Sequence, residues 1–204
     1  VGVRAMTGTS GGGFALMTEA VGEAGMTETP VVIVEAQRGG PSTGLPTKTE
    51  QGDLFQMLGA SEGEFPKAIL APRTLEECYA MTITAFNLAE KYQCPVIIAT
   101  DLYLAERLET FDGVEITHIP IERGELLTQP PAGNGYRRFL DTKTGVSPRA
   151  LPGMSGTVFT AATDEHDEDG IVISDVYTNP SMRAKMMEKR MRKMTSLSKE
   201  LPPP

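Results

Sequence analysis

The sequence predicts an α/β fold, an open doubly wound parallel sheet with helices on both faces. The first half of the chain repeats one order, in which a short apolar run is followed by a loop marked by Gly or Pro and then by apolar residues at helical spacing. The apolar runs are rich in β-branched residues and do not alternate with polar ones, which is typical of strands buried on both faces of a parallel sheet. Strands that alternate with helices in this way form right-handed crossover units.

The first cycle covers residues 1–36. We expect a strand over residues 1–7, which leads through the glycine turn at 11–13 into a helix over 14–25. Thr29-Pro30 ends this helix, because proline cannot continue it. The β-branched run 31–36 is the second predicted strand.

The second cycle completes the predicted sheet. A loop, a helix and a strand come first, at residues 38–47, 49–58 and 67–71. Thr74 and Glu77 have the spacing of a capping box, which starts a long helix that ends near Gln93. The last buried strand is expected over residues 95–100.

After about Ala105 the pattern changes. Three later segments have predicted structure: strands at 115–120 and 157–163, and a basic amphipathic helix over 181–199 that follows Pro180. Residues 124–156 are mostly turn-forming, and the prolines 202–204 end the chain as a linker would. We therefore divide the chain into an α/β unit, residues 1–105, and an extension of the same domain, residues 106–204, made of inter-subunit loops, a terminal helix and a linker.

Composition excludes several functions. The 19 Lys+Arg against 27 Asp+Glu give a net charge of −8, which argues against nucleic acid and anionic membrane as partners. No apolar run reaches the roughly 18 residues of a membrane span. Two cysteines, Cys78 and Cys94, cannot form a disulfide framework or an iron–sulfur site by themselves. We expect a soluble, cytoplasmic protein.

The first candidate site is the turn that contains Thr9, Ser10 and Gly11, between a strand and a helix. Glycines allow a ligand to approach the backbone, and free amides at a helix start favour an electronegative group. The spacing fits neither a dinucleotide fingerprint nor a phosphate loop. The alternative is a tight turn in which glycine serves packing only.

The second candidate is Arg38 with the loop behind it. In open α/β sheets, sites lie at the carboxyl ends of the strands, and Arg38 directly follows a buried strand. Its guanidinium can hold a carboxylate or phosphate in bidentate fashion, and Ser42, Thr43 and Thr47 add hydroxyl groups. The alternative is a surface arginine on a hairpin-like loop.

The remaining candidates are weaker. His166 lies in the acidic loop 164–169, but metal binding is not favoured because ligand spacing is poor and charge-rich loops are usually solvated. His118 and both cysteines are interpreted as structural. The terminal helix carries a methionine stripe that suggests a docking face for the core or a subunit: Met182, Met186, Met187, Met191 and Met194. Together with loop 124–156, this stripe leads us to expect self-association. We assign no catalytic residue and no metal ligand.

Three segments then show a specific resemblance, at residues 4–19, 25–34 and 37–54, and 145–149, 165–170 and 189–193 extend it. With these segments the chain resembles the alpha subunit of 2-oxoacid:ferredoxin oxidoreductases over nearly its whole length. The similarity is strongest toward the 2-oxoglutarate synthase branch. It implies a sheet of the thiamine-diphosphate-binding type, on the side of the cofactor's pyrimidine ring.

The resemblance also implies a function. The family oxidatively decarboxylates a 2-oxoacid, here 2-oxoglutarate by preference, to acyl-CoA and CO₂ and passes the electrons to ferredoxin. Thiamine diphosphate would be shared with a beta subunit that holds Mg²⁺ and an iron–sulfur cluster, and coenzyme A would be a co-substrate. On matching positions, Arg38 would bind the substrate carboxylate with Thr47 nearby. Thr9, Ser10 and Gly11 would line the aminopyrimidine.

The chain departs from the family by omission. Family members carry, before this region, a Tyr-Pro-Ile-Thr-Pro loop and the glutamate that bonds the pyrimidine, and a second domain follows. Glu19, Glu23 and Glu35 are not expected to replace that glutamate, because two lie on a helix and one lies within a strand. We therefore expect a chain that starts part-way through a domain and is inactive alone. The alternatives are a noncatalytic scaffold that docks a partner subunit, or the same chemistry on pyruvate or branched-chain 2-oxoacids.

Overall fold

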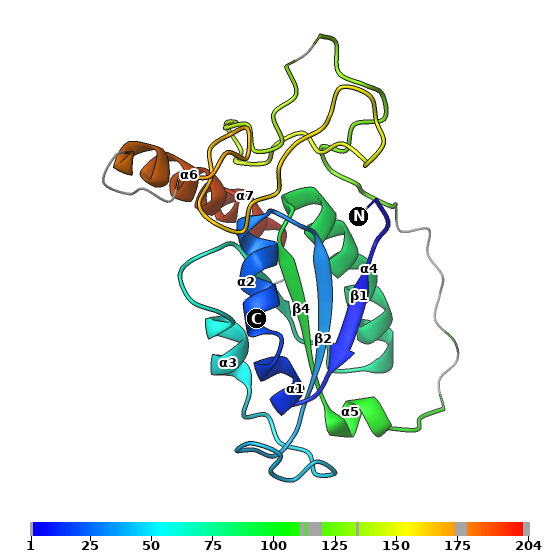
Figure 1. The fold of residues 1–204 in the computed structure, drawn as a ribbon. Helices are drawn as coiled ribbons and strands as arrows, with labels where there is room; N and C mark the ends of the chain where they lie inside the picture. The colour runs from blue at the N-terminus through cyan, green and yellow to red at the C-terminus, as the bar shows by residue number, and fades with distance from the viewer. Residues whose placement is uncertain (1, 111–112, 114–119, 134, 174–178, 202–204) are drawn as a thin grey trace.

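A parallel sheet forms the centre of the computed structural model, which describes residues 2–110, 113, 120–133, 135–173 and 179–201 (Figure 1). Its strands are β1 (Met6–Thr9), β2 (Val31–Gln37), β3 (Ala68–Leu70) and β4 (Pro95–Asp101). They lie in the order β1-β2-β4-β3, and all neighbouring pairs are parallel. The register places Val32 opposite both Met6 and Val96. The predicted parallel sheet is confirmed.

Helices cover both faces of this sheet. On one face α1 (Gly12–Ala15), α2 (Thr18–Met26) and α3 (Leu54–Gly59) pack on it, and on the other α4 (Leu75–Tyr92) and α7 (Met194–Glu200). Alternate residues of β2 and β4 enter opposite cores, so Val32 and Val96 face α4 while Ile33 and Ile97 face α1 to α3. Because both faces are buried, the first four residues of each central strand are apolar, and the doubly wound arrangement is confirmed.

Several boundaries differ from prediction. The first strand begins at Met6, and the helix expected over 14–25 is two helices separated by Leu16 and Met17. Helix α3 begins at Leu54 rather than residue 49. Helix α5 (Leu102–Glu106) was not predicted, although its signal is in the sequence. Asp101 ends β4 and caps α5, because its carboxylate accepts a hydrogen bond from the Leu104 N–H at 2.8 Å.

At the start of α4, one of the two hydrogen bonds of the predicted capping box forms. The Glu77 N–H donates to Thr74 Oγ1 at 3.2 Å, while the Glu77 carboxylate accepts from the Arg73 N–H at 2.7 Å instead of from Thr74. The helix ends at Tyr92, where Gln93 takes a left-handed conformation with φ 51°. Neither α4 nor any other helix among the described residues is long and apolar enough to cross a membrane.

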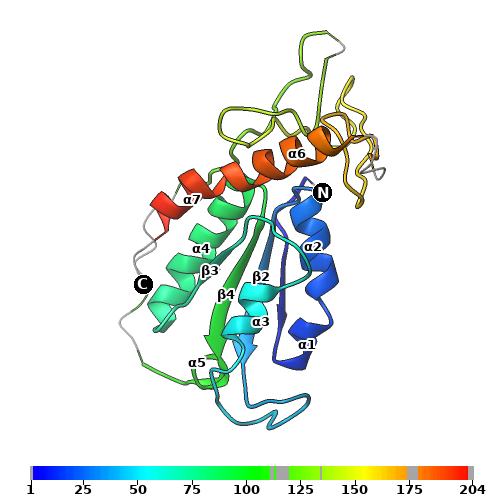
Figure 2. The same ribbon diagram turned by 90° about the vertical axis from the view of Figure 1, so that its left-hand side faces the viewer.

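The second half of the chain forms loops that gather near the amino ends of the strands, together with α6 (Pro180–Arg192) and α7 (Figures 1 and 2). The strand expected over 157–163 is wrong: the segment is irregular, and Val158 is 96% exposed. Most of the segment predicted as a strand at 115–120, with His118, lies outside the described residues. The terminal helix is divided at Lys193 into α6 and α7, although Lys193 itself keeps helical backbone angles, φ −54° and ψ −34°.

The terminal helices are basic but largely buried. Lys189 and Lys193 are fully buried, and each places its Nζ 2.5 Å from the Glu28 carboxylate at the end of α2. Arg138, also buried, donates to the Glu28 carbonyl at 2.6 Å. We call these four residues the buried ion cluster. In the methionine stripe Met186 is buried and the others are half-buried, so that stripe packs within the chain.

The acidic loop 164–169 is not the solvated segment that was predicted. His166 is completely buried, and its ring packs 4.0 Å from the Phe139 ring. Glu165 pairs with buried Arg190, and Glu168 pairs with Lys185. The error has a physical reason, because the cations that pair with this loop are distant in sequence, on α6 and at Arg137, and only the tertiary structure brings them close.

Candidate functional site at the carboxyl edge of the sheet

Three segments meet where the strands end: the turn after β1, the loop after β2 and the start of α5 after β4 (Figure 1). The parallel sheet causes this meeting, because parallel strands present all their carboxyl ends at one edge. The turn after β1 and the loop after β2 carry residues that were predicted as site residues. The helix α5 was not predicted.

Two hydrogen bonds to β2 fix the turn after β1. Ser10 Oγ donates to the Ala36 carbonyl at 2.7 Å, and the Gly11 N–H donates to Glu35 Oε1 at 2.5 Å. Gly11 has φ +56°, and a Cβ at this position would lie 3.0 Å from Arg38 Nε. The turn therefore needs glycine twice, for its backbone conformation and for the arginine that packs on it.

Arg38 is half-buried at the start of a closed loop. Its Nη1 donates to the Thr43 carbonyl at 2.8 Å, and it forms no ion pair with the acidic side chains that the structure describes. The base of the loop is closed where the Gly39 N–H donates to the Lys48 carbonyl at 3.1 Å. This bond brings Thr47, which is exposed, back to the segment that starts with Arg38.

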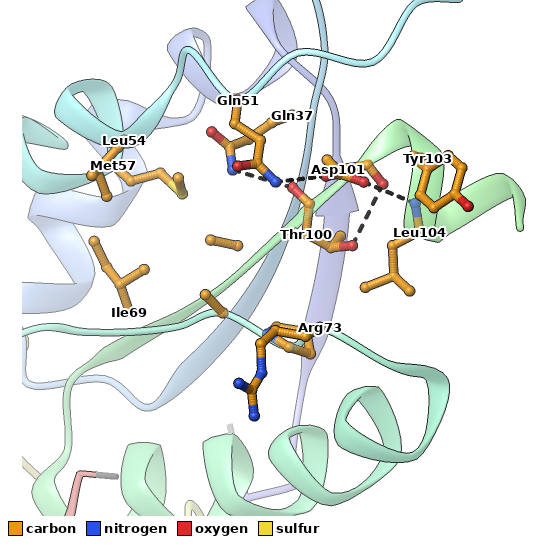
Figure 3. Close-up of a pocket in the computed structure, with 13 residues that line it drawn as sticks. Gln37, Gln51, Leu54, Met57, Ile69, Arg73, Thr100, Asp101, Tyr103 and Leu104 are labelled. Carbon is orange, nitrogen blue, oxygen red and sulfur yellow. Dashed lines mark hydrogen bonds between the residues drawn. The ribbon is translucent and has the colours of Figure 1, made fainter. Parts of the chain in front are cut away.

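A cavity of about 480 Å³ opens at the same edge (Figure 3). Polar side chains converge on one side of it: Gln51 Nε2 donates to Asp101 Oδ2 at 2.7 Å, and Gln37 Oε1 accepts from the Asp53 N–H at 3.1 Å. Leu54, Met57 and Ile69 form its apolar side. Such a cavity, apolar with a few fixed polar groups, is typical of small-molecule sites.

Sequence reasoning missed Gln37, Gln51 and Asp101. Two of them carried a usable signal, since Gln37 and Asp101 are the last residues of two buried strands, paired with each other in the sheet register. Gln51 gave no such signal, because it lies in an extended loop. None of the five predicted residues lines the cavity of Figure 3, although Arg38 directly follows Gln37.

The carboxyl group with the most altered acidity at this edge is Glu35. Its side chain is completely buried, and burial together with the nearby Asp53 carboxylate raises the pKa of Glu35 to about 7. The Gly11 hydrogen bond and the Arg38 charge oppose this shift only in part. Glu35 thus ionises near neutrality, which makes it a candidate for a functional role.

The structure brings Ser10, Gly11 and Arg38 together, and Thr9 precedes them at the end of β1. His166 lies in the second half of the chain, with Nδ1 3.0 Å from the Asp164 carbonyl. Among the described residues, no cluster of three or more His, Cys, Asp or Glu side chains could hold a metal ion. Cys78 and Cys94 are free thiols, and burial raises the pKa of Cys94 to about 12, as expected of a packing residue.

Comparison with known proteins decides the family. The family model described as the thiamine diphosphate-binding domain of pyruvate flavodoxin/ferredoxin oxidoreductases matches residues 1–190. The chain belongs to this family. Among curated relatives of the oxidoreductase family, the chain is 45% identical to subunit alpha of 2-oxoacid:ferredoxin oxidoreductase 1 from Sulfurisphaera tokodaii, over 98% of the chain and 31% of the relative. It is 49% identical to the 2-oxoglutarate synthase subunit KorA of Methanocaldococcus jannaschii, over 56% of the chain and 32% of the relative.

A solved structure of the same family has the same fold. The 2-oxoglutarate:ferredoxin oxidoreductase from Magnetococcus marinus, with 2-oxoglutarate, coenzyme A and succinyl-CoA bound, matches with a TM-score of 0.84 and 37% identity, over 99% of this chain and 34% of that one. The predicted family and fold type are therefore confirmed. The chain spans about a third of the length of the relatives it matches.

Proposed function

We propose that this chain forms part of the active site of a 2-oxoacid:ferredoxin oxidoreductase alpha subunit. The whole enzyme would oxidatively decarboxylate a 2-oxoacid, form acyl-CoA and CO₂, and pass the electrons to ferredoxin. The observation that carries the proposal is the contact between the Gly11 turn and Arg38 at the carboxyl edge of the sheet. The names of its relatives support the reaction class.

Arg38 would bind the substrate carboxylate. Its guanidinium is anchored at one nitrogen by the Thr43 carbonyl and keeps its charge free of any described acidic partner. An anchored, unpaired guanidinium is prepared to bind a carboxylate, because little side-chain entropy is lost on binding. Thr47, near the base of the same loop, would donate a hydroxyl hydrogen bond to the substrate.

Thr9, Ser10 and Gly11 would line the pyrimidine side of thiamine diphosphate. The backbone of Gly12 would lie beside the flat ring, because a Cβ there would have only the Ser42 carbonyl oxygen near it, at 3.8 Å, whereas Arg38 packs on Gly11 and Thr9 on Gly13. Ser10 is already tied to Ala36, so it would position the turn while its oxygen can still accept a hydrogen bond. When bound, thiamine diphosphate supplies the electron sink for loss of CO₂.

We propose 2-oxoglutarate as the substrate. Relatives with 48–49% identity are 2-oxoglutarate synthase subunits, and the solved relative holds 2-oxoglutarate and succinyl-CoA. Pyruvate and branched-chain 2-oxoacids would need the same carboxylate contact with Arg38. The three kinds of substrate would differ in how the rest of the molecule fits its cavity. Turnover measured with each of them side by side therefore shows which one the enzyme prefers.

The partner would be a beta subunit, which completes the site with Mg²⁺ and an iron–sulfur cluster. Exposed apolar side chains on α1's end and on α3 support docking at this edge: Leu16 is 89% and Phe55 85% exposed, with Leu54 and Leu58 about half exposed. Ferredoxin and coenzyme A would be co-substrates, and self-association stays a prediction. Two free thiols support a cytoplasmic location.

The division into an α/β unit, residues 1–105, and an extension, residues 106–204, is part of this proposal. Because the chain spans about a third of the length of the relatives it matches, we propose that residues 1–204 alone do not turn over substrate. Adding the complete alpha and beta subunits should restore turnover.

The test uses the complete alpha and beta subunits with ferredoxin and coenzyme A. Arg38→Ala should lower kcat/KM for 2-oxoglutarate by about 30-fold to several thousand-fold, because loss of a buried carboxylate contact costs roughly 2–5 kcal/mol. Lys199→Ala is the control, because Lys199 is an exposed residue of α7 and does not line the cavity of Figure 3. Unchanged kinetics of Arg38→Ala would leave the noncatalytic scaffold as the better interpretation of this chain.

A further inference from the structure

A buried carboxyl group lies directly under the proposed site and has no role in the function described above. Glu35 is 0% exposed although it carries an acidic side chain. One oxygen, Oε1, accepts the Gly11 N–H at 2.5 Å. The other, Oε2, is buried without a hydrogen-bond partner among the described residues. A buried carboxylate oxygen without a partner is costly, so this atom needs an explanation.

Asp53 offers the explanation. Its carboxyl group lies within hydrogen-bonding reach of Glu35, and its own Oδ2 is also buried and unpartnered within the described part of the chain. Two carboxylate oxygens cannot bond each other, because both only accept. A single proton between the two carboxyl groups satisfies both orphaned oxygens and removes one of two like charges.

We propose that Glu35 is a positioning residue that works in its neutral form. It accepts a hydrogen bond from the Gly11 N–H and donates one to the Asp53 carboxylate. Because it carries no charge in this form, the Arg38 charge stays available to the substrate carboxylate. The proposal rests on the function proposed above. It adds to it a residue that touches neither substrate nor cofactor but fixes the turn and the arginine that do.

The reason lies in the charges that face Glu35, which are Asp53 and Arg38. If Glu35 ionised, its carboxylate would attract the Arg38 guanidinium and compete with the substrate carboxylate for it. Because the pKa of Glu35 is about 7, its ionised fraction would rise from roughly one tenth at about pH 6 to nine tenths at about pH 8. Substrate binding should weaken over this interval.

The wild type and three variants of the complete enzyme test this: Glu35→Gln, Asp53→Asn and the double variant. In Glu35→Gln the new side-chain amide can accept from Gly11 and donate to Asp53, so it imitates the neutral acid. In the wild type, KM for 2-oxoglutarate should rise about tenfold between about pH 6 and pH 8, with a smaller change in kcat. In Glu35→Gln, KM should stay low and independent of pH.

Asp53→Asn removes the neighbour that holds the proton on Glu35. KM at neutral pH should therefore rise toward the high-pH wild-type value, and adding Glu35→Gln should restore it. The Asp53 side chain makes no capping hydrogen bond to α3, so this change removes no helix bond. Glu64→Gln, at an exposed position, is the control that should retain the wild-type pH dependence.

A second readout does not depend on turnover. The infrared carbonyl band of a protonated carboxyl group should disappear as pH rises through 7 in the wild type and in Glu64→Gln, and this band should be missing in Glu35→Gln. Equal pH slopes of KM in wild type and Glu35→Gln, or no band assignable to Glu35, would overturn the inference. An enzyme that turns over no 2-oxoacid would refute the proposed function, while the infrared titration would still decide the state of Glu35.

Discussion

Replacing Glu28 by glutamine tests the buried ion cluster that fastens α6 and α7 to the rest of the fold. Glu28 is fully buried and accepts two fully buried lysines, Lys189 and Lys193, each at 2.5 Å. Burial alone would raise the pKa of Glu28, but Lys193, Lys189 and Arg138 hold it well below its usual value. Glu28 is thus an anion between three cations.

The expected loss can be worked out from this geometry. Glu28→Gln keeps the volume of the side chain but leaves Lys189, Lys193 and Arg138 with no anion, and removing one partner of a buried ion pair costs about 3–5 kcal/mol. Burial already lowers the pKa of Lys189 to about 8, with the Lys193 charge adding to the effect, so without Glu28 this lysine should lose its proton near neutrality and the loss should lie toward the lower end of that range. The opening equilibrium of α6 and α7 should rise roughly 100-fold to several thousand-fold.

Amide hydrogen exchange of α6 and α7 in the complete alpha subunit measures this opening directly. Glu188→Gln is the control on the same helix, because Glu188 is 77% exposed and its pair with Arg192 should contribute less than about 1 kcal/mol. Adding Lys193→Met to Glu28→Gln should recover part of the loss. Exchange as slow in Glu28→Gln as in Glu188→Gln would refute the reasoning.

Three further outcomes are expected. Folding raises the pKa of Glu35 from 4.5 to about 7, so between these values the folded chain keeps a proton that the unfolded chain has lost. The free energy of unfolding should therefore fall as pH rises through this interval. Urea unfolding at about pH 5 and pH 8 should show a smaller fall in Glu35→Gln than in the wild type. Gly44→Ala would place a Cβ 2.2 Å from a loop carbonyl and should raise KM about tenfold, whereas Gly63→Ala, where a Cβ meets no described atom within 4 Å, should not. Thr74→Ala should cost about 1 kcal/mol in urea unfolding, and Thr84→Ala, within the same helix, clearly less.

The sequence was most informative where the local residue pattern and the burial of a segment agree. The apolar runs of β2 and β4 have helices over both faces, so their patterns predicted central parallel strands. Arg38 was predicted as a site residue because it follows such a strand directly, and the structure places it after β2. The segment at 157–163 misled because β-branched residues predict a strand only when a neighbouring strand is present to pair with it.

The candidate site was predicted in part. Ser10, Gly11 and Arg38 could be placed at one edge from topology alone, because parallel strands end together. The cavity of Figure 3 could not, since Gln51 reaches Asp101 across fifty residues of sequence. Nothing in the sequence assigned Glu35 a positioning role, because it was considered there only as a replacement for the glutamate that bonds the pyrimidine and was rejected since it lies within a strand.

By itself, the sequence determined the α/β class, the order of the central elements and the family, since these depend on periodicity, turn residues and contiguous motifs. Only the tertiary structure decided which charges meet. Glu28 and Lys189 are 161 residues apart, and nothing local in either segment indicates the other. Burial sets the cost of a charge and the fold sets its partners, so the raised pKa of Glu35 and the ion cluster at Glu28 follow from the folded chain alone.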